Sequence, residues 1–426
     1  MGTCADNANG VKASGLHNPW VQLAAGVFGM IAITNLQYGW TYFVDPIHDR
    51  FGWTKSSIQI AFTLFVIAET WLVPLEGYLV DRFGPRAMVA VGGVLAGMGW
   101  VINAHAGSLA QLYVGSALAG IGAGIVYGAA IGNALKWFPT RRGLAAGLTA
   151  AAFGAGSALT VIPILDTIAE HGYEAGFFYF GIAQGAAVLC CALWMRIPPE
   201  AQPRPETPVA DVQTRDYRWV EVVRMPIFWL MYGMFVMVAV GGLMVTAQLR
   251  TIATDFGVAD TPMTFLAWTT SALAMASIID RILNGLTRPL FGYISDHIGR
   301  EKTMFVAFTL EGAAILLLLQ FAHIPSLFVI LTGLTFFAWG EVFSLFPALC
   351  GDLFGRRFAT TNYGLLYTAK GTAALLVPLA SVLHDVCDSW QPVFVIAAVL
   401  NWVTALLALV ALRPLATRLR TDHPAL

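Results

Sequence analysis

Two stretches of closely similar sequence, GYLVDRFGPR at 77–86 and GYISDHIGR at 292–300, lie 215 residues apart in this chain of 426 residues. The same offset continues on both sides of them. The matched pairs are Pro74 with Pro289, Gly77 with Gly292, Tyr78 with Tyr293, Asp81 with Asp296, Gly84 with Gly299, Arg141 and Arg142 with Arg356 and Arg357, and Pro163 with Pro378. Because the shared residues are Pro, Gly, Asp and Arg rather than common apolar residues, we interpret the chain as a tandem duplication.

The composition predicts that both halves lie in a membrane. Hydrophobic residues make up 57% of the chain and charged residues 12%, whereas a soluble domain carries about 25% charged residues. A spanning helix needs about 20 apolar residues, so the apolar content suffices for about twelve spans. A soluble enzyme, a disordered chain and a disulfide scaffold are excluded. The net charge of −1 excludes a nucleic-acid partner, and five cysteines without a C-x-x-C motif indicate no metal site.

The apolar runs predict an all-α membrane protein with twelve transmembrane helices in two six-helix bundles. We expect the spans near 20–44, 57–80, 87–104, 109–135, 143–168, 175–197, 227–250, 264–294, 303–322, 326–351, 358–383 and 390–412. Five prolines between 198 and 208 mark an extended connection after the sixth span. The predicted organisation is an N-terminal tail (1–19), a first six-helix bundle (20–197), a cytoplasmic linker (198–224), a second six-helix bundle (225–413) and a C-terminal tail (414–426).

The distribution of Lys and Arg predicts the orientation. With both termini placed in the cytoplasm, 18 of the 24 basic residues fall on the cytoplasmic side, three in outer loops and three inside spans. Positive charge favours the cytoplasmic side, so we expect a multi-pass protein of the plasma (inner) membrane with both tails cytoplasmic. We expect a monomer whose partners are the lipid bilayer and a small-molecule substrate.

The repeated stretch resembles the G-x-x-x-D-R-x-G-R loop signature of the major facilitator superfamily. The resemblance implies twelve helices and alternating access. It implies a gating or structural role for Gly77, Asp81, Arg82 and Gly84 in the first copy and for Gly292, Asp296, Gly299 and Arg300 in the second. Asp81 and Asp296 are placed to bond a helix N-terminus or a guanidinium and so latch helix pairs together. His297 stands where the signature has Arg, so we expect a weaker second latch.

Two cations are expected near the middle of the membrane. Arg288 lies 8 residues from Asp296 and Lys370 lies 13 residues from Arg357, which places both about 12–20 Å inside the bilayer. An ionisable residue at this depth costs about 2.5–3.5 kcal/mol on insertion scales. Their counterparts in the first half are apolar, so packing symmetry does not require them. We interpret Arg288 and Lys370 as an anion-binding site without counter-ions of its own.

Polar and aromatic residues on neighbouring spans are expected to line this site. Tyr363, Tyr367 and Lys370 are spaced to share one helix face, as are Arg281 and Arg288. The other lining candidates are Gln37, Tyr38, Thr41 and Tyr42 on the first span, Tyr127 on the fourth, Asn284 on the eighth, and Trp339 and Phe343 on the tenth. Aromatic walls around fixed cations make a low-dielectric pocket in which an anion gains more from each charge than in water.

Six segments narrow the resemblance to the oxalate:formate antiporter family. They are LQYGWTY (36–42), GAGIVYG (122–128), KWFPTRRGLAAG (136–147), RPLFGYISDHIGR (288–300), WGEVFSLFP (339–347) and NYGLLYTAKG (362–371). The resemblance implies that Arg288 and Lys370 bind a carboxylate between the two halves. It also implies that Gln37, Tyr38, Tyr127 and Trp339 line the cavity.

Three lining positions depart from the family pattern. Tyr367 stands where an oxalate carrier has Trp, and Phe153 and Phe343 stand where it has Tyr. The losses of two hydroxyls and the exchange of one ring change the size and polarity of the pocket. The resemblance therefore predicts a small carboxylate, either a mono- or a dicarboxylate, more firmly than it predicts oxalate.

Acidic residues inside the spans leave the coupling mechanism open. Glu69 and Glu341 lie at mid-depth, and Asp280 lies nearer the outer end of its span. Any of these three carboxyl groups would be able to carry a proton with the substrate, which makes proton-coupled monocarboxylate symport the alternative. Anion exchange is the main expectation, because two empty cations repel each other and oppose closure until an anion neutralises them.

A membrane enzyme and a receptor are the rival classes of protein. The eight histidines lie in loops, tails or span ends, whereas a haem or a metal centre in the membrane would need them at mid-depth. The sequence has no H-E-x-x-H, G-x-S-x-G or P-loop motif. We therefore expect no enzymatic activity, no cofactor and no metal ion.

Overall fold

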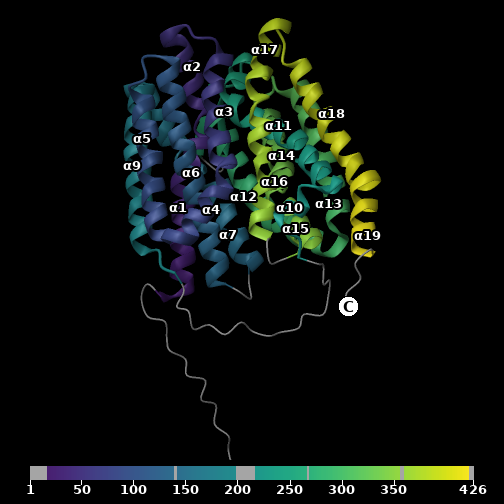
Figure 1. Cartoon of the computed structure of the whole chain (residues 1–426). Helices are drawn as coiled ribbons and strands as arrows, with labels where there is room; N and C mark the ends of the chain where they lie inside the picture. The colour runs from purple at the N-terminus through teal and green to yellow at the C-terminus, as the bar shows by residue number, and fades with distance from the viewer. Residues whose placement is uncertain (1–16, 139–141, 198–215, 266–267, 356–358, 422–426) are drawn as a thin grey trace, which may run out of the picture.

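Residues 17–138, 142–197, 216–265, 268–355 and 359–421 are described by the computed structural model (Figure 1). The first half contains α1 (Pro19–Tyr38), α2 (Thr41–Phe51), α3 (Lys55–Trp71), α4 (Val73–Phe83), α5 (Pro85–Ala104), α6 (Leu109–Trp137), α7 (Arg142–Ala155), the 3-10 turn η2 (Gly156–Leu159), α8 (Val161–His171) and α9 (Tyr173–Trp194). The second half contains α10 (Trp219–Val222), α11 (Pro226–Asp255), β1 (Pro262–Phe265), β2 (Trp268–Ser271), α12 (Ala272–Ile298), α13 (Arg300–Phe321), α14 (Pro325–Trp339), α15 (Val342–Phe354), α16 (Ala359–Ala374), α17 (Val377–Cys387), α18 (Gln391–Leu407), the π-helical turn η3 (Ala408–Leu412) and α19 (Arg413–Thr421).

The two halves stand side by side, with their helices running along a common direction (Figure 1). We call the end that holds Pro19 and Thr421 the lower end, and the end that holds Phe51 and Cys387 the upper end, as they appear in Figure 1. Each half begins and finishes at the lower end, as an even number of spans requires.

The described helices account for all twelve expected spans. Ten helical stretches are long and apolar enough to cross a bilayer. The second and eighth expected spans correspond to α3 with α4 and to α12, which cross the bundle in the same way but carry more ionisable residues. The predicted all-α membrane fold is therefore confirmed.

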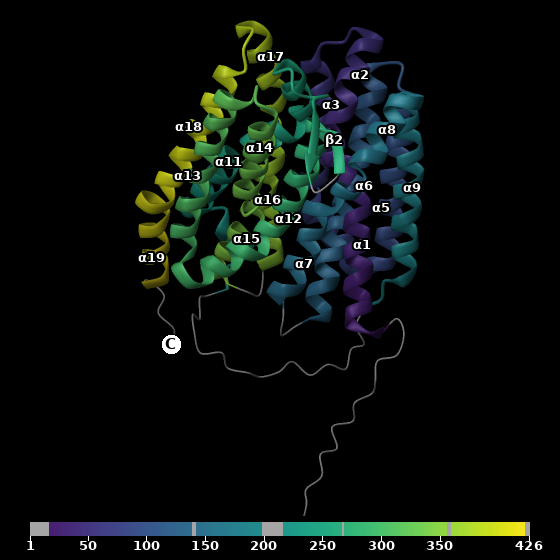
Figure 2. The ribbon, with the colours of Figure 1, turned by 180° about the vertical axis from the view of Figure 1, so that it is seen from behind.

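Several spans are broken where hydropathy alone predicts continuous helices. The first span bends at Gly39 and Trp40 and continues through α2 to Phe51, seven residues beyond the expected end. The eighth span begins at Ala272 rather than near 264, because Ser271 caps α12 by accepting a hydrogen bond from the Ala274 amide at 3.3 Å. The preceding residues form the β1–β2 hairpin, which lies at the boundary between the halves (Figure 2).

The backbone repeats along with the sequence. Gly84 and Gly299, which are matched in the duplication, adopt φ values of +82° and +94°, a region that side chains other than glycine rarely enter. Each glycine ends one helix and begins the next. The break between α7 and α8 also recurs between α16 and α17, and α8 and α17 are each 11 residues long.

The halves meet most extensively along two helix pairs, α3 with α16 and α7 with α12. Glycines bring these helices together: a Cβ at Gly371 of α16 would lie 2.7 Å from the Trp71 ring of α3. A Cβ at Gly285 of α12 would lie 2.7 Å from the Cβ of Ala155, where α7 ends. The indole of Trp71 also donates a hydrogen bond to the Thr368 carbonyl across the boundary, at 2.9 Å.

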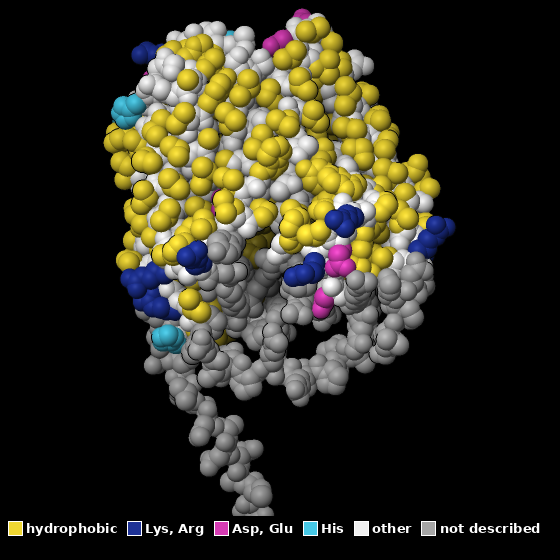
Figure 3. Space-filling model, viewed as in Figure 1, with side chains coloured by type: hydrophobic (Ala, Val, Ile, Leu, Met, Phe, Trp, Pro, Cys, Tyr) yellow, Lys and Arg dark blue, Asp and Glu magenta, His cyan; other side chains and the backbone are white. Residues whose placement is uncertain are grey.

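The upper end is closed by polar contacts between the halves. Asp45 of α2 pairs with Lys55 of its own half at 3.3 Å and with Arg250 of α11 in the other half at 3.7 Å. Deeper in the bundle, the Gln59 amide donates to the Ala247 carbonyl at 3.0 Å. At the lower end the surface is hollowed between the halves, and Lys and Arg side chains lie on both sides of the hollow (Figure 3). The structure is therefore closed at the upper end and hollowed at the lower end.

The predicted linker (198–224) is described only from residue 216. Its last part is attached to the second half, because the Tyr217 amide donates to the Phe354 carbonyl at 2.9 Å. The Asn362 amide in turn donates to the Tyr217 carbonyl at 3.0 Å.

Candidate functional site

Lys370 is placed by α16 at the boundary between the halves, where 1% of its side chain is exposed. Its ammonium donates to Gln37 Oε1 of α1 at 2.8 Å and to Glu69 Oε2 of α3 at 2.8 Å. Both acceptors belong to the first half. The third acceptor is the Tyr367 hydroxyl, one turn earlier on α16, at 3.3 Å. A single ammonium from the second half thus connects two helices of the first.

Arg288 approaches the same boundary from α12, with 3% of the residue exposed. Its Nη1 donates to the Ala150 carbonyl of α7, at 2.9 Å. Its Cζ lies 4.8 Å from the centre of the Phe343 ring, which is a cation–π distance. Among the described residues, its Nε has no hydrogen-bond partner and no carboxylate forms an ion pair with it. Arg288 is a buried cation with donors available.

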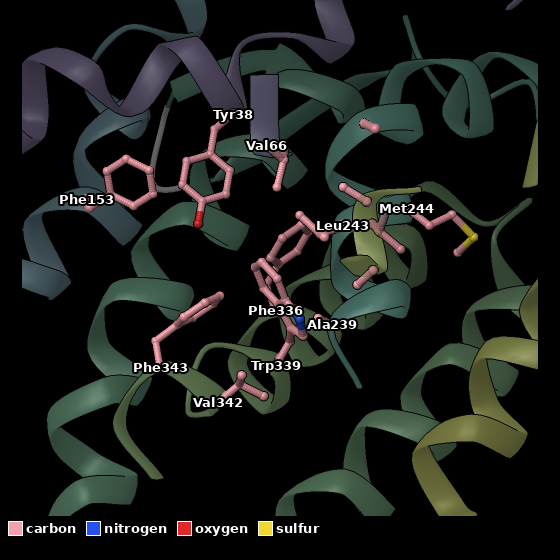
Figure 4. Close-up of a cluster of buried hydrophobic side chains, with 14 of the residues drawn as sticks. Tyr38, Val66, Phe153, Ala239, Leu243, Met244, Phe336, Trp339, Val342 and Phe343 are labelled. Carbon is pink, nitrogen blue, oxygen red and sulfur yellow. The ribbon is translucent and has the colours of Figure 1, made fainter. Parts of the chain in front are cut away.

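Six aromatic rings from both halves surround these two cations. Tyr127 stacks on Tyr367 with ring centres 5.7 Å apart. The remaining neighbouring pairs are Tyr127 with Phe153 at 5.4 Å, Tyr38 with Phe153 at 5.6 Å, Phe343 with Tyr367 at 6.1 Å and Trp339 with Phe343 at 5.3 Å. Tyr38 and Phe153 face Phe343 and Trp339 across one space in Figure 4. The ring of aromatic side chains therefore spans the boundary.

Five of the expected lining residues, Gln37, Tyr38, Tyr127, Trp339 and Tyr367, are brought together as a group. Gln37 and Tyr367 contact Lys370 directly, and Tyr127 reaches it through Tyr367. The Tyr38 hydroxyl accepts a hydrogen bond from the Asn284 amide of α12 at 2.9 Å, which is a further link between the halves. Trp339 is the most remote, since it joins the group through Phe343.

Arg281 lies apart from these two cations, higher on α12. Its Cζ is sandwiched between the rings of Tyr38 at 4.3 Å and Phe336 at 4.2 Å. Such stacking stabilises a buried guanidinium. Arg281 thus packs against Tyr38 on the side of the closed upper end.

The expectation that both cations lack a counter-ion is wrong for Lys370. Glu69 forms an ion pair with it at 2.8 Å, and both side chains are 1% exposed. The reason is the packing of α3 against α16, which places two residues 301 positions apart at the same depth. Of the two cations, only Arg288 remains without a carboxylate among the described residues.

The other two acids considered for proton coupling lie inside the second half. Asp280 is fully buried and faces Thr332 of α14. Glu341 is fully buried between α14 and α15, where its electrostatic neighbour is Glu311 of α13. Of the three acids, Glu69 is therefore the one that contacts a site cation.

The loop residues of the repeated signature are partly described. Gly77 lies within α4 and Gly292 within α12. Arg300 donates from Nε to Asp352 Oδ2 of α15 at 3.2 Å and also contacts the Ser295 hydroxyl, which fastens the start of α13. Arg82 packs against the Phe83 ring at 5.6 Å. The Asp81 and Asp296 side chains, on which the latch was predicted, lie outside the described part.

A membrane bundle of two similar halves, with a buried charged site where they meet, defines a carrier. The sequence model of the Major Facilitator Superfamily matches residues 23–285 and 233–425. The chain belongs to this superfamily and is a multi-pass membrane transporter, not an enzyme.

Individual relatives agree with this assignment. The chain is 33% identical over 395 residues to the oxalate:formate antiporter of Oxalobacter formigenes, which covers 92% of this chain and 91% of that protein. It is 25% identical over 370 residues to an uncharacterized MFS-type transporter, YhjX of Escherichia coli (strain K12), covering 84% and 86%. It is also 35% identical over 199 residues to human monocarboxylate transporter 11, covering 45% and 41%.

Proposed function

We propose that this transporter moves a small carboxylate anion across the membrane by alternating access. The observation that carries the proposal is the position of Arg288 and Lys370, two buried cations of the second half that bond to the first half across the boundary. The names of two relatives, an oxalate:formate antiporter and a monocarboxylate transporter, support this substrate class.

The proposed binding mode follows from the donors at the boundary. A carboxylate entering through the hollow of the lower end meets Arg288, whose planar guanidinium offers paired donors to two oxygens. The carbon part of the substrate then lies against Phe343 and the neighbouring rings. Gln37 and Ala150 of the first half accept hydrogen bonds from the two cations of the second half. An anion bound to these cations therefore lies at the contact between the halves, where its binding affects how the halves move against each other.

Anion exchange is the mode of transport that we propose. The charge of Arg288 is unmatched among the described residues, and closing the lower end would remove it further from water. An isolated charge in a dry protein interior is strongly unfavourable. A bound anion cancels this charge, so the loaded carrier closes at the lower end more readily than the empty one.

Proton-coupled symport is the second candidate function. The contact that favours it is the one between Glu69 and Lys370, because a carboxyl group at the site is able to exchange a proton when the substrate arrives. In this mode the carboxylate and a proton cross together.

The orientation and assembly are part of the same proposal. We place the lower end, which holds both termini, in the cytoplasm and the chain in the plasma (inner) membrane. The excess of basic residues on this side supports the placement. We propose a monomer as the working unit, because one chain supplies both halves of the site.

Replacing either cation tests the site. In proteoliposomes, Arg288→Gln and Lys370→Gln should each abolish uptake of labelled formate, because each change removes a positive charge at the boundary. Arg413→Gln, at an exposed position of α19, makes the same change away from the site and should transport normally. Membrane insertion and yield are compared for all three. Normal uptake by either site variant would refute the site.

Counterflow separates the two modes of transport. Exchange predicts that unlabelled carboxylate inside the vesicles stimulates uptake without a proton gradient. Symport predicts that uptake into empty vesicles depends on the gradient, and that Glu69→Gln removes this dependence. Glu341→Gln provides the matched control, because its carboxyl group is equally buried but lies within the second half.

A further inference from the structure

The ammonium of Lys370 has no donor left for a substrate. An ammonium carries three N–H donors, and the three are taken by Gln37, Glu69 and Tyr367. A substrate oxygen reaches this ammonium directly only when one of these acceptors moves away. Glu69 is the acceptor that also carries a charge, and its carboxylate stands where one end of a dicarboxylate would otherwise bind.

Arg288, unlike Lys370, still has N–H donors left for a substrate. Its Nη1 bonds to the Ala150 carbonyl, a neutral group, and its Nε has no partner among the described residues. The guanidinium has five N–H donors in total. Arg288 therefore offers one substrate carboxylate both hydrogen-bond donors and a positive charge.

The charges in contact at the site sum to one positive charge. Lys370 and Arg288 contribute two, and Glu69 at 2.8 Å cancels one. Arg281 is held between the Tyr38 and Phe336 rings, away from these groups, and lies outside this sum. A monocarboxylate neutralises the remaining charge. A dicarboxylate would leave one buried negative charge without a partner, which is strongly unfavourable in a low-dielectric site.

We propose that Glu69 acts as a built-in anion on Lys370 and restricts this carrier to monocarboxylates. This inference rests on the proposed function and narrows its substrate class. It assigns Arg288 as the group that binds the substrate carboxylate and Glu69 as the residue that determines specificity.

Uptake by the purified full-length carrier in proteoliposomes tests the proposal, with formate and acetate as monocarboxylates and oxalate and malonate as dicarboxylates. The wild type should take up the monocarboxylates at least about tenfold faster. Glu69→Gln keeps the shape and an acceptor oxygen for Lys370 but removes the negative charge. It should raise the ratio of dicarboxylate to monocarboxylate uptake by about tenfold or more.

Glu76→Gln is the matched control. Glu76 is a buried acid seven residues further along, on α4, where it faces the backbone at Gly124 of α6. This variant should keep the wild-type preference. Glu69→Asp keeps the charge and should keep the preference as well. Thermal stabilisation of each purified variant by the four anions reports binding even where a variant transports slowly.

Each outcome bears on one proposal. Dicarboxylate uptake by the wild type that equals or exceeds monocarboxylate uptake overturns the inference. An unchanged ratio in Glu69→Gln, or an equal shift in Glu76→Gln, overturns the assignment to Glu69. If the wild type transports none of the four anions while remaining folded, the proposed function fails instead.

Discussion

At the scale of single residues, the site depends on two cations that differ in their partners. Their existence was predictable, because ionisable side chains at mid-depth need a reason to be there. The pairing of Lys370 with Glu69 was not predictable, although the sequence places both residues at mid-depth. Depth along a helix can be counted in the sequence, but which helix of the other half lies opposite depends on packing across the boundary.

Arg288→Lys tests the importance of the guanidinium itself. Lysine keeps the charge but loses the planar fork that allows one donor to hold the Ala150 carbonyl while others face the substrate. We expect the initial rate of formate uptake to fall at least about tenfold, equivalent to about 1.4 kcal/mol of transition-state stabilisation. Arg413→Lys is the control at an exposed position. A normal rate in Arg288→Lys would mean that charge alone is sufficient.

At the scale of helices, the sequence predicted the spans but not their breaks. Runs of apolar residues show where the chain crosses the membrane, yet the breaks at Gly39 and between α16 and α17 leave hydropathy unchanged. The β1–β2 hairpin was likewise assigned to a helix. The duplication gave a better signal, because the matched Gly84 and Gly299 share the same unusual backbone conformation.

Gly371→Val tests the close approach of α3 and α16. A Cβ at this position would lie 2.7 Å from the Trp71 ring, so the two helices must move apart and the neighbouring Lys370–Glu69 pair is strained. We expect a lower melting temperature of the purified protein and slower uptake. Gly351→Val introduces the same side chain on α15, where a Cβ meets no atom within 4 Å, and should change both values much less. Equal effects would contradict the role of the contact.

At the scale of the whole molecule, the structure is closed above and hollowed below. The two-half architecture was predictable from the repeat. Which end is closed was not predictable. The same sequence must adopt a conformation closed at the upper end and one closed at the lower end during transport, and the relative free energies of the two conformations depend on contacts between the halves. Asp45 at the upper end illustrates this: in the sequence it is only an acid near the end of the first span, and its partner Arg250 is only an outer-loop cation.

Asp45→Asn should weaken the closure of the upper end. The change removes the ion pair with Arg250 and leaves fewer contacts to oppose opening. A cysteine introduced at Ala247, a buried position below this pair whose carbonyl still accepts from Gln59, should then react faster with a membrane-impermeant thiol reagent added from the upper side. Glu170→Gln removes an acid that pairs within one half, with His171, and should leave the reaction rate unchanged. No acceleration in Asp45→Asn would show that other contacts keep this end closed.

The partnership of Lys370 and Glu69 also has a consequence for biogenesis. The chain is synthesised from its N-terminus, so α3 is already in the bilayer when α16 emerges about 300 residues later. A helix with an ammonium at its centre is costly to insert alone. Here the carboxylate that neutralises it, Glu69 of α3, belongs to the half that is synthesised first. The second half, expressed without the first, would have to bury that ammonium with no opposite charge from α3. The first half therefore assists the insertion of the second half into the membrane.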